Sequence, residues 1–317
     1  FMESNRTISI KLLNAIDNNQ LLIALPLAGS GIRALRFMKE LNKGKIKKIY
    51  VNDKKPNFKK QFQKSLTENK IKRKPVIKNE DANLFLLKEI GFDYIDLDPF
   101  GTPNPFLAAA INKISRNGIL AITATDTAAL TGTYPKVTKR KYWATTTKNY
   151  LMHEIGLRIL IRKIQLIGVQ FDKALTPILS YHKDHYFRIY LQASKGKQTC
   201  DQLLKQHQYL LYNHKTTEFK TSNYNQEKDF EFHGPLWTGK LNNQELLKKV
   251  DDPSINQLSK EQDTVGFYDL HVLAKKHNKA PPKIDVALKK LKASRTHFSK
   301  NGIKTKKNLK EVLKVML

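Results

Sequence analysis

Residues 21–31 read LLIALPLAGSG, a short apolar run that ends in a glycine turn. Residues 32–41, IRALRFMKEL, follow at once and place apolar side chains at helical spacing. The two segments together predict a buried strand, a tight turn and a helix. This order opens the βαβ units that bind nucleotides, although many α/β proteins contain such a turn without a ligand.

The alternation of strand and helix continues along the chain. Four further segments combine apolar strand-forming residues with polar ends: 48–53, 75–78, 92–97 and 119–125. A helix is expected over 56–70, and a long amphipathic helix over 148–168. Paired strands are expected over 174–182 and 185–193. The pattern predicts an α/β fold with a doubly wound, mostly parallel sheet.

The composition changes after Ala193, where Lys, Gln, Asn and Tyr replace the regular apolar pattern. We therefore predict a domain boundary that divides the chain into residues 1–193 and residues 194–317. Helical patterns around a turn at 299–302 favour a smaller α+β, winged-helix-like module in the second domain.

The formal net charge is +29, from 57 Lys and Arg against 28 Asp and Glu. A charge of this size attracts polyanions, of which nucleic acid is the commonest. The alternative is a lysine-rich composition that serves solubility alone. No apolar run reaches the roughly 18 residues of a membrane span, and the opening FMESNR lacks the apolar segment of a signal peptide. We expect a cytoplasmic protein with no membrane contact.

One cysteine, Cys200, excludes an internal disulfide and a multi-cysteine zinc site. His182 and His185 flank Asp184, but a hairpin with polar tips explains them better than a metal site does. We therefore expect no metal.

Three strand ends carry residues suited to an adenosine-containing cofactor. Asp53 follows the glycine turn by about twenty residues, where a carboxylate can accept both ribose hydroxyls. Asp81 and Ala82, at the next strand end, are placed to contact an adenine ring through the carboxylate and a backbone amide. Each position alone is more often a solvated strand end, whereas their order predicts the cofactor.

Residues 98–101, Asp-Pro-Phe-Gly, follow the strand over 92–97. An exocyclic amino group is a weak nucleophile, so its methylation requires an acceptor that polarises its N–H groups. Asp98 supplies that acceptor, and Phe100 supplies a ring on which a displaced base can stack. The structural alternative is a βα turn in which Asp98 caps a helix.

The chain resembles the tRNA guanine-26 N2-dimethyltransferase family, and the likeness covers nearly all of it except about 195–233. The segments that carry the resemblance are 92–103 (FDYIDLDPFGTP), 123–128 (TATDTA), 153–160 (HEIGLRIL), 267–271 (FYDLH) and 293–299 (ASRTHFS). The resemblance implies a Rossmann-like class I methyltransferase domain over 1–193 and a tRNA-binding domain over 194–317. It also implies transfer of one or two methyl groups from S-adenosylmethionine to the N2 of guanosine 26 in tRNA. We expect the protein to be a monomer.

The resemblance implies roles for seven residues, of which Asp98 and Phe100 hold the guanine. The residues implied to hold S-adenosylmethionine are Arg6, Arg33, Asp53, Asp81 and Ala82. The single cysteine makes this an archaeal-like member that lacks the four-cysteine zinc site of some relatives.

Two departures from the family pattern keep other functions open. Leu25 and Pro26 stand where the family carries an acid after the first strand, and Phe1 opens the chain just after the place of an aromatic-Asn-Pro segment. One alternative is a non-catalytic tRNA-binding protein on a degenerate methyltransferase fold. A DNA amino-methyltransferase is a further alternative, based on residues 98–100 alone.

Overall fold

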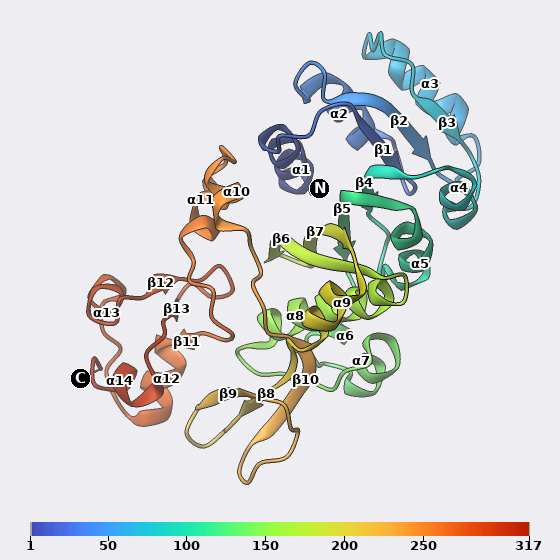
Figure 1. Cartoon of the computed structure of the whole chain (residues 1–317). Coiled ribbons are helices and arrows are strands. Elements are labelled where there is room, and N and C mark those ends of the chain that lie inside the picture. The colour runs from blue at the N-terminus through green and yellow to red at the C-terminus, as the bar shows by residue number, and fades with distance from the viewer. Residues whose placement is uncertain (1, 317) are drawn as a thin grey trace.

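The computed structural model describes residues 2–316. A seven-stranded sheet forms its centre, with the strand order β3-β2-β1-β4-β5-β7-β6 (Figure 1). The pairs from β3 to β5 are parallel, whereas β7 runs antiparallel to both β5 and β6. The strands are β1 (Leu21–Leu25), β2 (Ile46–Asn52), β3 (Val76–Lys78), β4 (Phe92–Leu97), β5 (Ile114–Ala124), β6 (Lys173–Lys183) and β7 (Tyr186–Lys195).

Helices cover both faces of this sheet. Buried side chains of α1, α2 and α3 form one apolar cluster, and those of α4, α5 and α8 belong to another. Within residues 2–316, no helix has the length and apolar character needed to cross a bilayer. The helices up to residue 204 are α1 (Glu3–Ala15), α2 (Ile32–Glu40), α3 (Phe58–Glu68), α4 (Ala82–Lys88), α5 (Asn104–Lys113), α6 (Thr127–Leu130), α7 (Pro135–Tyr142), α8 (Met152–Val169) and α9 (Lys197–Leu204).

The predicted α/β sheet is confirmed, and most of its strands lie within two residues of the expected bounds. The strand predicted over 92–97 is β4, residue for residue. The prediction was wrong for β5, which begins at Ile114 rather than at 119. Ile114 pairs with Phe92 at the start of β4, so a tertiary contact extends β5 through a polar segment that the apolar pattern missed.

Residues 207–237 form a second, antiparallel sheet with the order β10-β8-β9. Its strands are β8 (His207–Tyr212), β9 (Phe219–Ser222) and β10 (Glu231–Trp237). Trp237 of β10 is buried in the apolar cluster that also contains side chains of α8. This sheet therefore shares its core with the central sheet.

The C-terminal part carries a third sheet and its own apolar core. The order of its elements, a helix, a strand, two helices and a two-stranded wing, is the winged-helix arrangement predicted from the sequence. Its elements, with the preceding helix α10, are α10 (Gln244–Lys248), α11 (Pro253–Lys260), β11 (Tyr268–Asp269), α12 (Leu270–His277), α13 (Ile284–Lys290), β12 (Ser294–Arg295), β13 (Gly302–Lys304) and α14 (Leu309–Leu313).

A buried ion cluster joins this C-terminal part to α8. Glu154 Oε1 accepts hydrogen bonds from Arg158 Nε at 2.9 Å, Lys304 Nζ at 2.9 Å and the Gly266 amide at 3.0 Å. Burial alone would raise the pKa of Glu154, yet Lys304 and Arg158 outweigh it and hold that pKa below its usual value. Because removal of one partner would strand a buried charge, this contact fixes the two parts together.

The turn after β1 depends on Gly31, whose φ of +79° lies in the left-handed region. A methyl group there would lie 2.3 Å from Phe62 Cδ2, and Phe62 is buried. We expect Gly31→Ala to destabilise the protein by about 2–4 kcal/mol, because left-handed strain and overpacking add. Urea unfolding measures this loss.

Gly44→Ala is the matched control, since Gly44 has a φ of +88° and no atom within 4 Å of the added methyl group. Its free energy of unfolding should fall only by the cost of the left-handed strain, about 1–2 kcal/mol. Equal losses in the two variants would contradict the packing role of Gly31.

Candidate active site

The carboxyl end of β4 brings two acidic side chains to one place. Asp96 and Asp98 are two residues apart on an extended segment, so they point to the same side of the chain. β4 lies beside β1, whose following turn leads into the first residues of α2. Side chains of α1 and α2 therefore meet these two carboxylates.

Arg33, in the first turn of α2, bridges both acids. Its Nη2 donates to Asp98 Oδ2 at 2.6 Å, and its Nη1 lies 3.4 Å from Asp96 Oδ2. Nη1 also donates to Asn5 Oδ1 at 3.3 Å and to Ser9 Oγ at 3.0 Å, both on α1. The guanidinium is 7% exposed, so it is fixed from several sides.

Asp96 is held from its other side by Arg188 of β7. The two side chains form a bidentate pair, with Nη1 to Oδ1 at 3.0 Å and Nη2 to Oδ2 at 2.7 Å. The Tyr94 hydroxyl donates to the same carboxylate at 2.6 Å. Burial alone would raise the pKa of Asp96, but Arg188 and Arg33 outweigh it and lower that pKa below its usual value. Asp96 is therefore a buried anion.

Arg33 and Asp98 line a narrow cavity of about 60 Å³. Arg6 of α1 also lines it, and burial followed by the charge of Arg33 lowers the pKa of the Arg6 guanidinium. Leu25 lines the cavity at the end of β1, so its carboxylates come from β4 and not from β1. The remaining lining residues are Leu27, Ala28, Ile32 and Asp96.

The other predicted cofactor residues lie outside this cavity, at the ends of β2 and β3. Asp53 Oδ2 accepts from the Gly29 amide at 2.7 Å, which ties the end of β2 to the glycine turn. Asn52 Nδ2 donates to the Glu80 carbonyl at 3.0 Å and thereby joins the ends of β2 and β3. Three of the five predicted cofactor residues, Asp53, Asp81 and Ala82, therefore lie at successive strand ends and not in one pocket.

Asp81 was interpreted from the sequence as a strand end, and the structure also makes it the N-cap of α4. Its Oδ1 accepts from the amides of Asn83 at 2.9 Å and Leu84 at 3.2 Å. Ala82 is the first residue of that helix and is buried. Asp81 is exposed, and its second carboxylate oxygen accepts no hydrogen bond from residues 2–316.

The loop over 98–103 is anchored to the end of β5. The Gly101 amide donates to Thr125 Oγ1 at 2.7 Å, and the Thr125 amide donates to the Gly101 carbonyl at 2.9 Å. The helix α5 begins at Asn104 with Pro103 at its cap position, so Asp98 does not cap a helix. Phe100, two residues after Asp98, is fully exposed.

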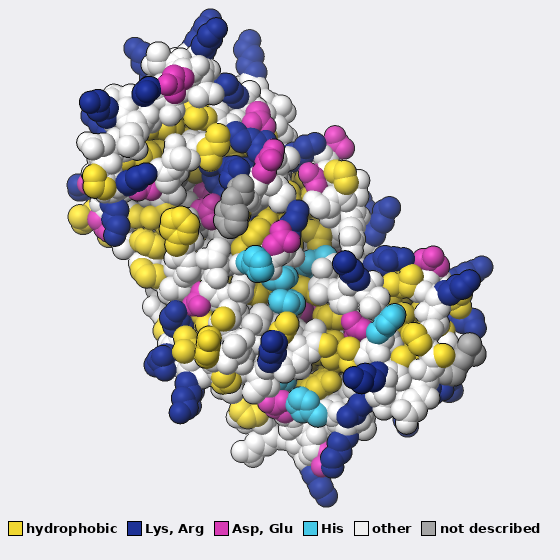
Figure 2. All heavy atoms as spheres, turned by 180° about the vertical axis from the view of Figure 1, so that it is seen from behind, with side chains coloured by type: hydrophobic (Ala, Val, Ile, Leu, Met, Phe, Trp, Pro, Cys, Tyr) yellow, Lys and Arg dark blue, Asp and Glu magenta, His cyan; other side chains and the backbone are white. Residues whose placement is uncertain are grey.

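Histidines lie near the turn of the β6–β7 hairpin. Figure 2 shows histidines gathered at the centre of the face that is turned away from the viewer in Figure 1. The His182 and His153 rings stack at 3.9 Å, and the His182 amide donates to His297 Nε2 at 3.4 Å. Burial, then the neighbouring histidines, lower the pKa of His182 to about 3. Asp184 turns the hairpin at a φ of +50°. Among residues 2–316, no group of three or more His, Cys, Asp or Glu side chains is arranged to hold a metal ion.

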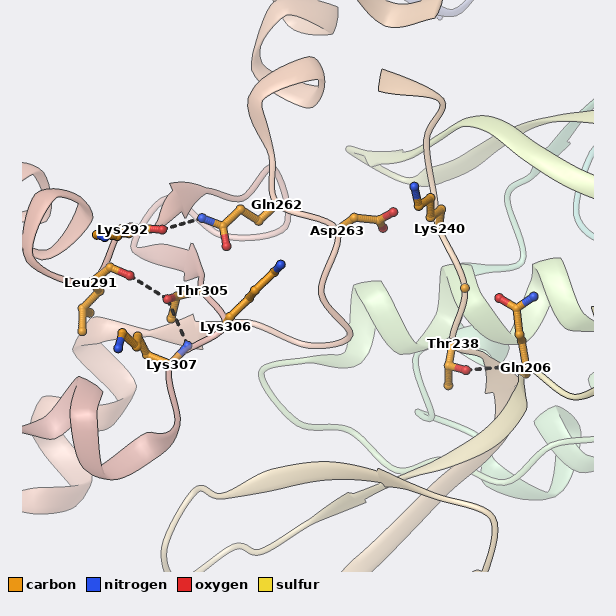
Figure 3. A pocket seen from close by; sticks show the side chains of 11 residues that line it. Gln206, Thr238, Lys240, Gln262, Asp263, Leu291, Lys292, Thr305, Lys306 and Lys307 are labelled. Carbon is orange, nitrogen blue, oxygen red and sulfur yellow. Dashed lines mark hydrogen bonds between the residues drawn. The ribbon is translucent and has the colours of Figure 1, made fainter. Parts of the chain in front are cut away.

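A larger cavity, about 720 Å³, lies elsewhere, between the segment over 238–240 and the C-terminal module (Figure 3). None of the predicted site residues lines it. Four lysines do: Lys240, Lys292, Lys306 and Lys307. The smaller cavity at Asp98 is the candidate active site, because paired carboxylates and guanidinium groups converge there.

Asp96 and Arg188 are site residues that the sequence reasoning missed. Their signal was present in part, since Asp96 and Asp98 form an Asp-x-Asp spacing at the end of a strand. Arg188 carried no such signal because its partner lies 92 positions away. Only the pairing of β5 with β7 brings the two side chains together.

The sequence and the structure were both compared with those of known proteins. The family described as N2,N2-dimethylguanosine tRNA methyltransferase matches residues 1–317. The tRNA (guanine(26)-N(2)/guanine(27)-N(2))-dimethyltransferase of Aquifex aeolicus is 39% identical over 93% of this chain and 82% of its own length. The tRNA (guanine(26)-N(2))-dimethyltransferase of Pyrococcus furiosus is 34% identical over 99% of this chain and 91% of its own. The structure of Trm1 from Pyrococcus horikoshii with S-adenosyl-L-methionine matches with a TM-score of 0.91 and 28% identity, covering 99% of this chain and 93% of that one.

The buried pair of Asp96 and Arg188 generates a stability prediction. Asp96→Asn should destabilise the protein by about 3–5 kcal/mol at pH 7, because two buried guanidinium groups lose their shared anion. The low pKa of Asp96 means that its stabilisation is present at neutral pH and is lost as the pH falls through the folded-state pKa. The gap between wild type and variant should therefore shrink in acid, as measured by urea unfolding across pH.

Glu40→Gln is the control, because Glu40 pairs with Arg36 on the surface. The free energy of unfolding of this variant should fall by at most about 1 kcal/mol. A loss of that small size in Asp96→Asn would show that the buried pair does not hold the site.

Proposed function

The chain belongs to the N2,N2-dimethylguanosine tRNA methyltransferase family, and on that premise we propose which of its residues carry the reaction. The activity is transfer of one or two methyl groups from S-adenosylmethionine to the exocyclic N2 of guanosine 26 in tRNA. The observation that carries the residue assignment is the convergence of Asp98, Arg33 and Arg6 on one cavity at the end of β4.

Arg6 and Arg33 are proposed to hold the methionine carboxylate of S-adenosylmethionine. Both guanidinium groups line the cavity, and a guanidinium binds a carboxylate through paired hydrogen bonds. The cavity of about 60 Å³ has room for that end of the cofactor only. S-adenosylmethionine supplies an electrophilic methyl group bound to its sulfonium sulfur.

The ribose and adenine are proposed to lie along the strand ends. Asp53 would accept the ribose hydroxyls, and its contact with the Gly29 amide holds its carboxylate at the turn. Asp81 would accept from the adenine amine while Ala82 donates its backbone amide. The hydrogen bonds between the ends of β2 and β3 keep these residues in register with each other.

Asp98 is proposed to accept a hydrogen bond from the N2–H of the target guanine. This contact returns electron density to a nitrogen whose lone pair is delocalised into the ring, and it gives the departing proton an acceptor. The side chain is 26% exposed, so a base can reach it, and before the cofactor binds its salt bridge to Arg33 holds it at the cavity. Phe100, fully exposed two residues on, would stack on the flipped base.

The competing reading is a tRNA-binding protein without catalysis, motivated by Leu25 in place of the family acid. The cavity argues against it, since its lining retains Asp96 and Asp98 from the neighbouring strand. In our proposal, the acids that follow β4 take the place of the acid that the family carries at the position of Leu25.

We further propose that the enzyme acts as a monomer in the cytoplasm, with residues 194–317 as its tRNA-binding domain. A single chain supplies all the proposed cofactor and guanine contacts. The net charge of +29, summed over the full sequence, favours a polyanionic partner.

Asp98→Asn tests the catalytic assignment. We expect methyl transfer to unmodified tRNA to fall by about 100-fold or more, because an amide is a poorer proton acceptor than a carboxylate. Nucleoside analysis of N2-methylated guanosine measures it, and calorimetry should show that cofactor binding is retained. Asp229→Asn, on an exposed turn, is the matched control and should keep full activity.

Full activity in Asp98→Asn would remove Asp98 from the reaction. No transfer by the wild type, with tRNA still bound, would instead support the non-catalytic reading.

Asp81→Asn separates the cofactor role of Asp81 from its role as a helix cap. An asparagine caps a helix about as well as an aspartate, so the melting temperature should not change. Its amide group cannot accept a hydrogen bond from the adenine amine while its oxygen caps the helix, so S-adenosylmethionine affinity should fall by about 5–10-fold. Calorimetric titration measures the affinity. Unchanged affinity would leave Asp81 with the cap alone.

A further inference from the structure

The helix α7 presents a basic and aromatic surface. It lies beside the loop over 98–103, here called the catalytic loop, which carries Asp98 and Phe100. Lys136, Lys139 and Arg140 are all exposed, at spacings of three and four residues that place them on neighbouring parts of one helix face. The aromatic side chains at the two ends of the helix are also exposed, Tyr134 by 58% and Trp143 by 47%. Cations interleaved with exposed rings are typical of surfaces that bind nucleic acid strands.

Beneath this face lie two cations that lack an acidic partner among residues 2–316. Lys163 of α8 is only 5% exposed, and its Nζ lies 2.8 Å from the centre of the Trp143 ring. Arg162 donates to the Trp143 carbonyl at 3.1 Å and forms no ion pair with the described residues. Burial, and then Arg162, lower the pKa of Lys163 to about 8, while burial lowers the pKa of Arg162.

Most other buried cations have polar partners within the protein. Lys45, which pairs with no carboxylate of residues 2–316, donates to the Ile16 and Asn18 carbonyls. Arg33, Arg188 and Lys304 each pair with an aspartate or a glutamate. A desolvated cation without an anion is costly, so an anion from another molecule would stabilise the α7 surface. A row of phosphates supplies such anions at regular intervals.

The C-terminal end of α7 is attached to the catalytic loop. Asn104 Nδ2 donates to the Lys141 carbonyl at 2.9 Å, and the Tyr142 hydroxyl donates to Thr102 Oγ1 at 3.1 Å. Lys141 Nζ pairs with Asp126 at 2.9 Å, one residue after the Thr125 that anchors Gly101. A ligand held on α7 is therefore held close to Asp98 and Phe100.

We propose that the α7 surface, formed by Tyr134, Lys136, Lys139, Arg140 and Trp143 over Arg162 and Lys163, binds the sugar-phosphate backbone of the substrate tRNA next to the target guanosine. The proposal rests on the proposed function, because it assigns the contact that presents guanosine to Asp98. The lysines and arginines contact phosphates, and Trp143 stacks on an adjacent base or ribose. In Figure 2, turned by 180° from Figure 1, Lys and Arg side chains line the lower left edge, where α7 lies.

The test combines Lys136→Ala, Lys139→Ala and Arg140→Ala in one variant. All three side chains are exposed, so the fold should remain stable. We expect the Kd for unmodified tRNA to rise by about 10–100-fold, and the slope of log Kd against log salt to fall by about 2–3. The Kd for S-adenosylmethionine and the kcat at saturating tRNA should stay within about twofold of wild type.

The matched control replaces Lys59, Lys60 and Lys64 of α3 with alanine, which removes the same charge from the opposite end of the sheet. It should change tRNA affinity by less than about threefold, since only the long-range field is reduced. Equal losses in the two triple variants would overturn the proposal in favour of a diffuse positive field. A wild type that binds tRNA but transfers no methyl group would refute the proposed function instead, and leave the α7 contact standing.

Trp143→Ala and Trp143→Phe test the stacking contact separately. The alanine variant should weaken tRNA binding by about 5–50-fold, and phenylalanine should restore most of it, because an aromatic ring is the feature required. Unchanged binding in Trp143→Ala would show that Trp143 only covers Lys163. Weak tRNA binding with tight retention of an acidic polypeptide such as polyglutamate would redirect the surface to a protein partner and refute the RNA contact.

Discussion

The buried carboxylate of Asp96 is the interaction on which the rest of the site depends. It is the shared anion between Arg188 of β7 and Arg33 of α2, and both of these side chains are buried. Two such cations are tolerated in an interior only when a well-placed anion satisfies them. Asp96 therefore fixes the helix after the glycine turn and the antiparallel strand β7 to the end of β4, and Asp98 follows two residues later.

A second buried anion holds the C-terminal module against α8 in the same way. Glu154 binds Arg158 on its own helix and Lys304 on the wing strand β13. Glu261, which burial alone would leave with a raised pKa, is held near a pKa of about 2 by His297, Lys304 and Thr296. Since both acids contact Lys304, the C-terminal module is fixed by charges that are satisfied inside the protein. The uncompensated positive charge is left to the surface, where a polyanion can use it.

The sequence was sufficient for whatever depends on local pattern and insufficient for whatever depends on distant partners. β4 was predicted to the residue because its apolar run is bounded by a glycine and by Asp98-Pro99. The start of β5 was missed because residues 114–118 become a strand only by pairing with β4. The same limit concealed the contact between Arg188 and Asp96, whereas Asp98 could be put forward as a candidate because its proline and aromatic neighbours are adjacent to it. The role of Asp81 as a helix cap follows a local rule and could have been predicted from the helix that begins at Ala82.

Arg33 has one guanidinium and, under the proposed assignment, three anionic partners: Asp96, Asp98 and the cofactor carboxylate. In the structure its Nη2 is committed to Asp98 at 2.6 Å, while Nη1 is held by Asn5, Ser9 and Asp96. A cofactor carboxylate at this cavity must therefore share or take the Nη2 contact, because the Nη1 side is enclosed. Loss of that contact leaves Asp98 with an open acceptor position, which is what an incoming N2–H requires. Cofactor binding and the readiness of Asp98 for guanine are then linked through a single side chain, and the linkage is reciprocal because both anions draw on the same charge.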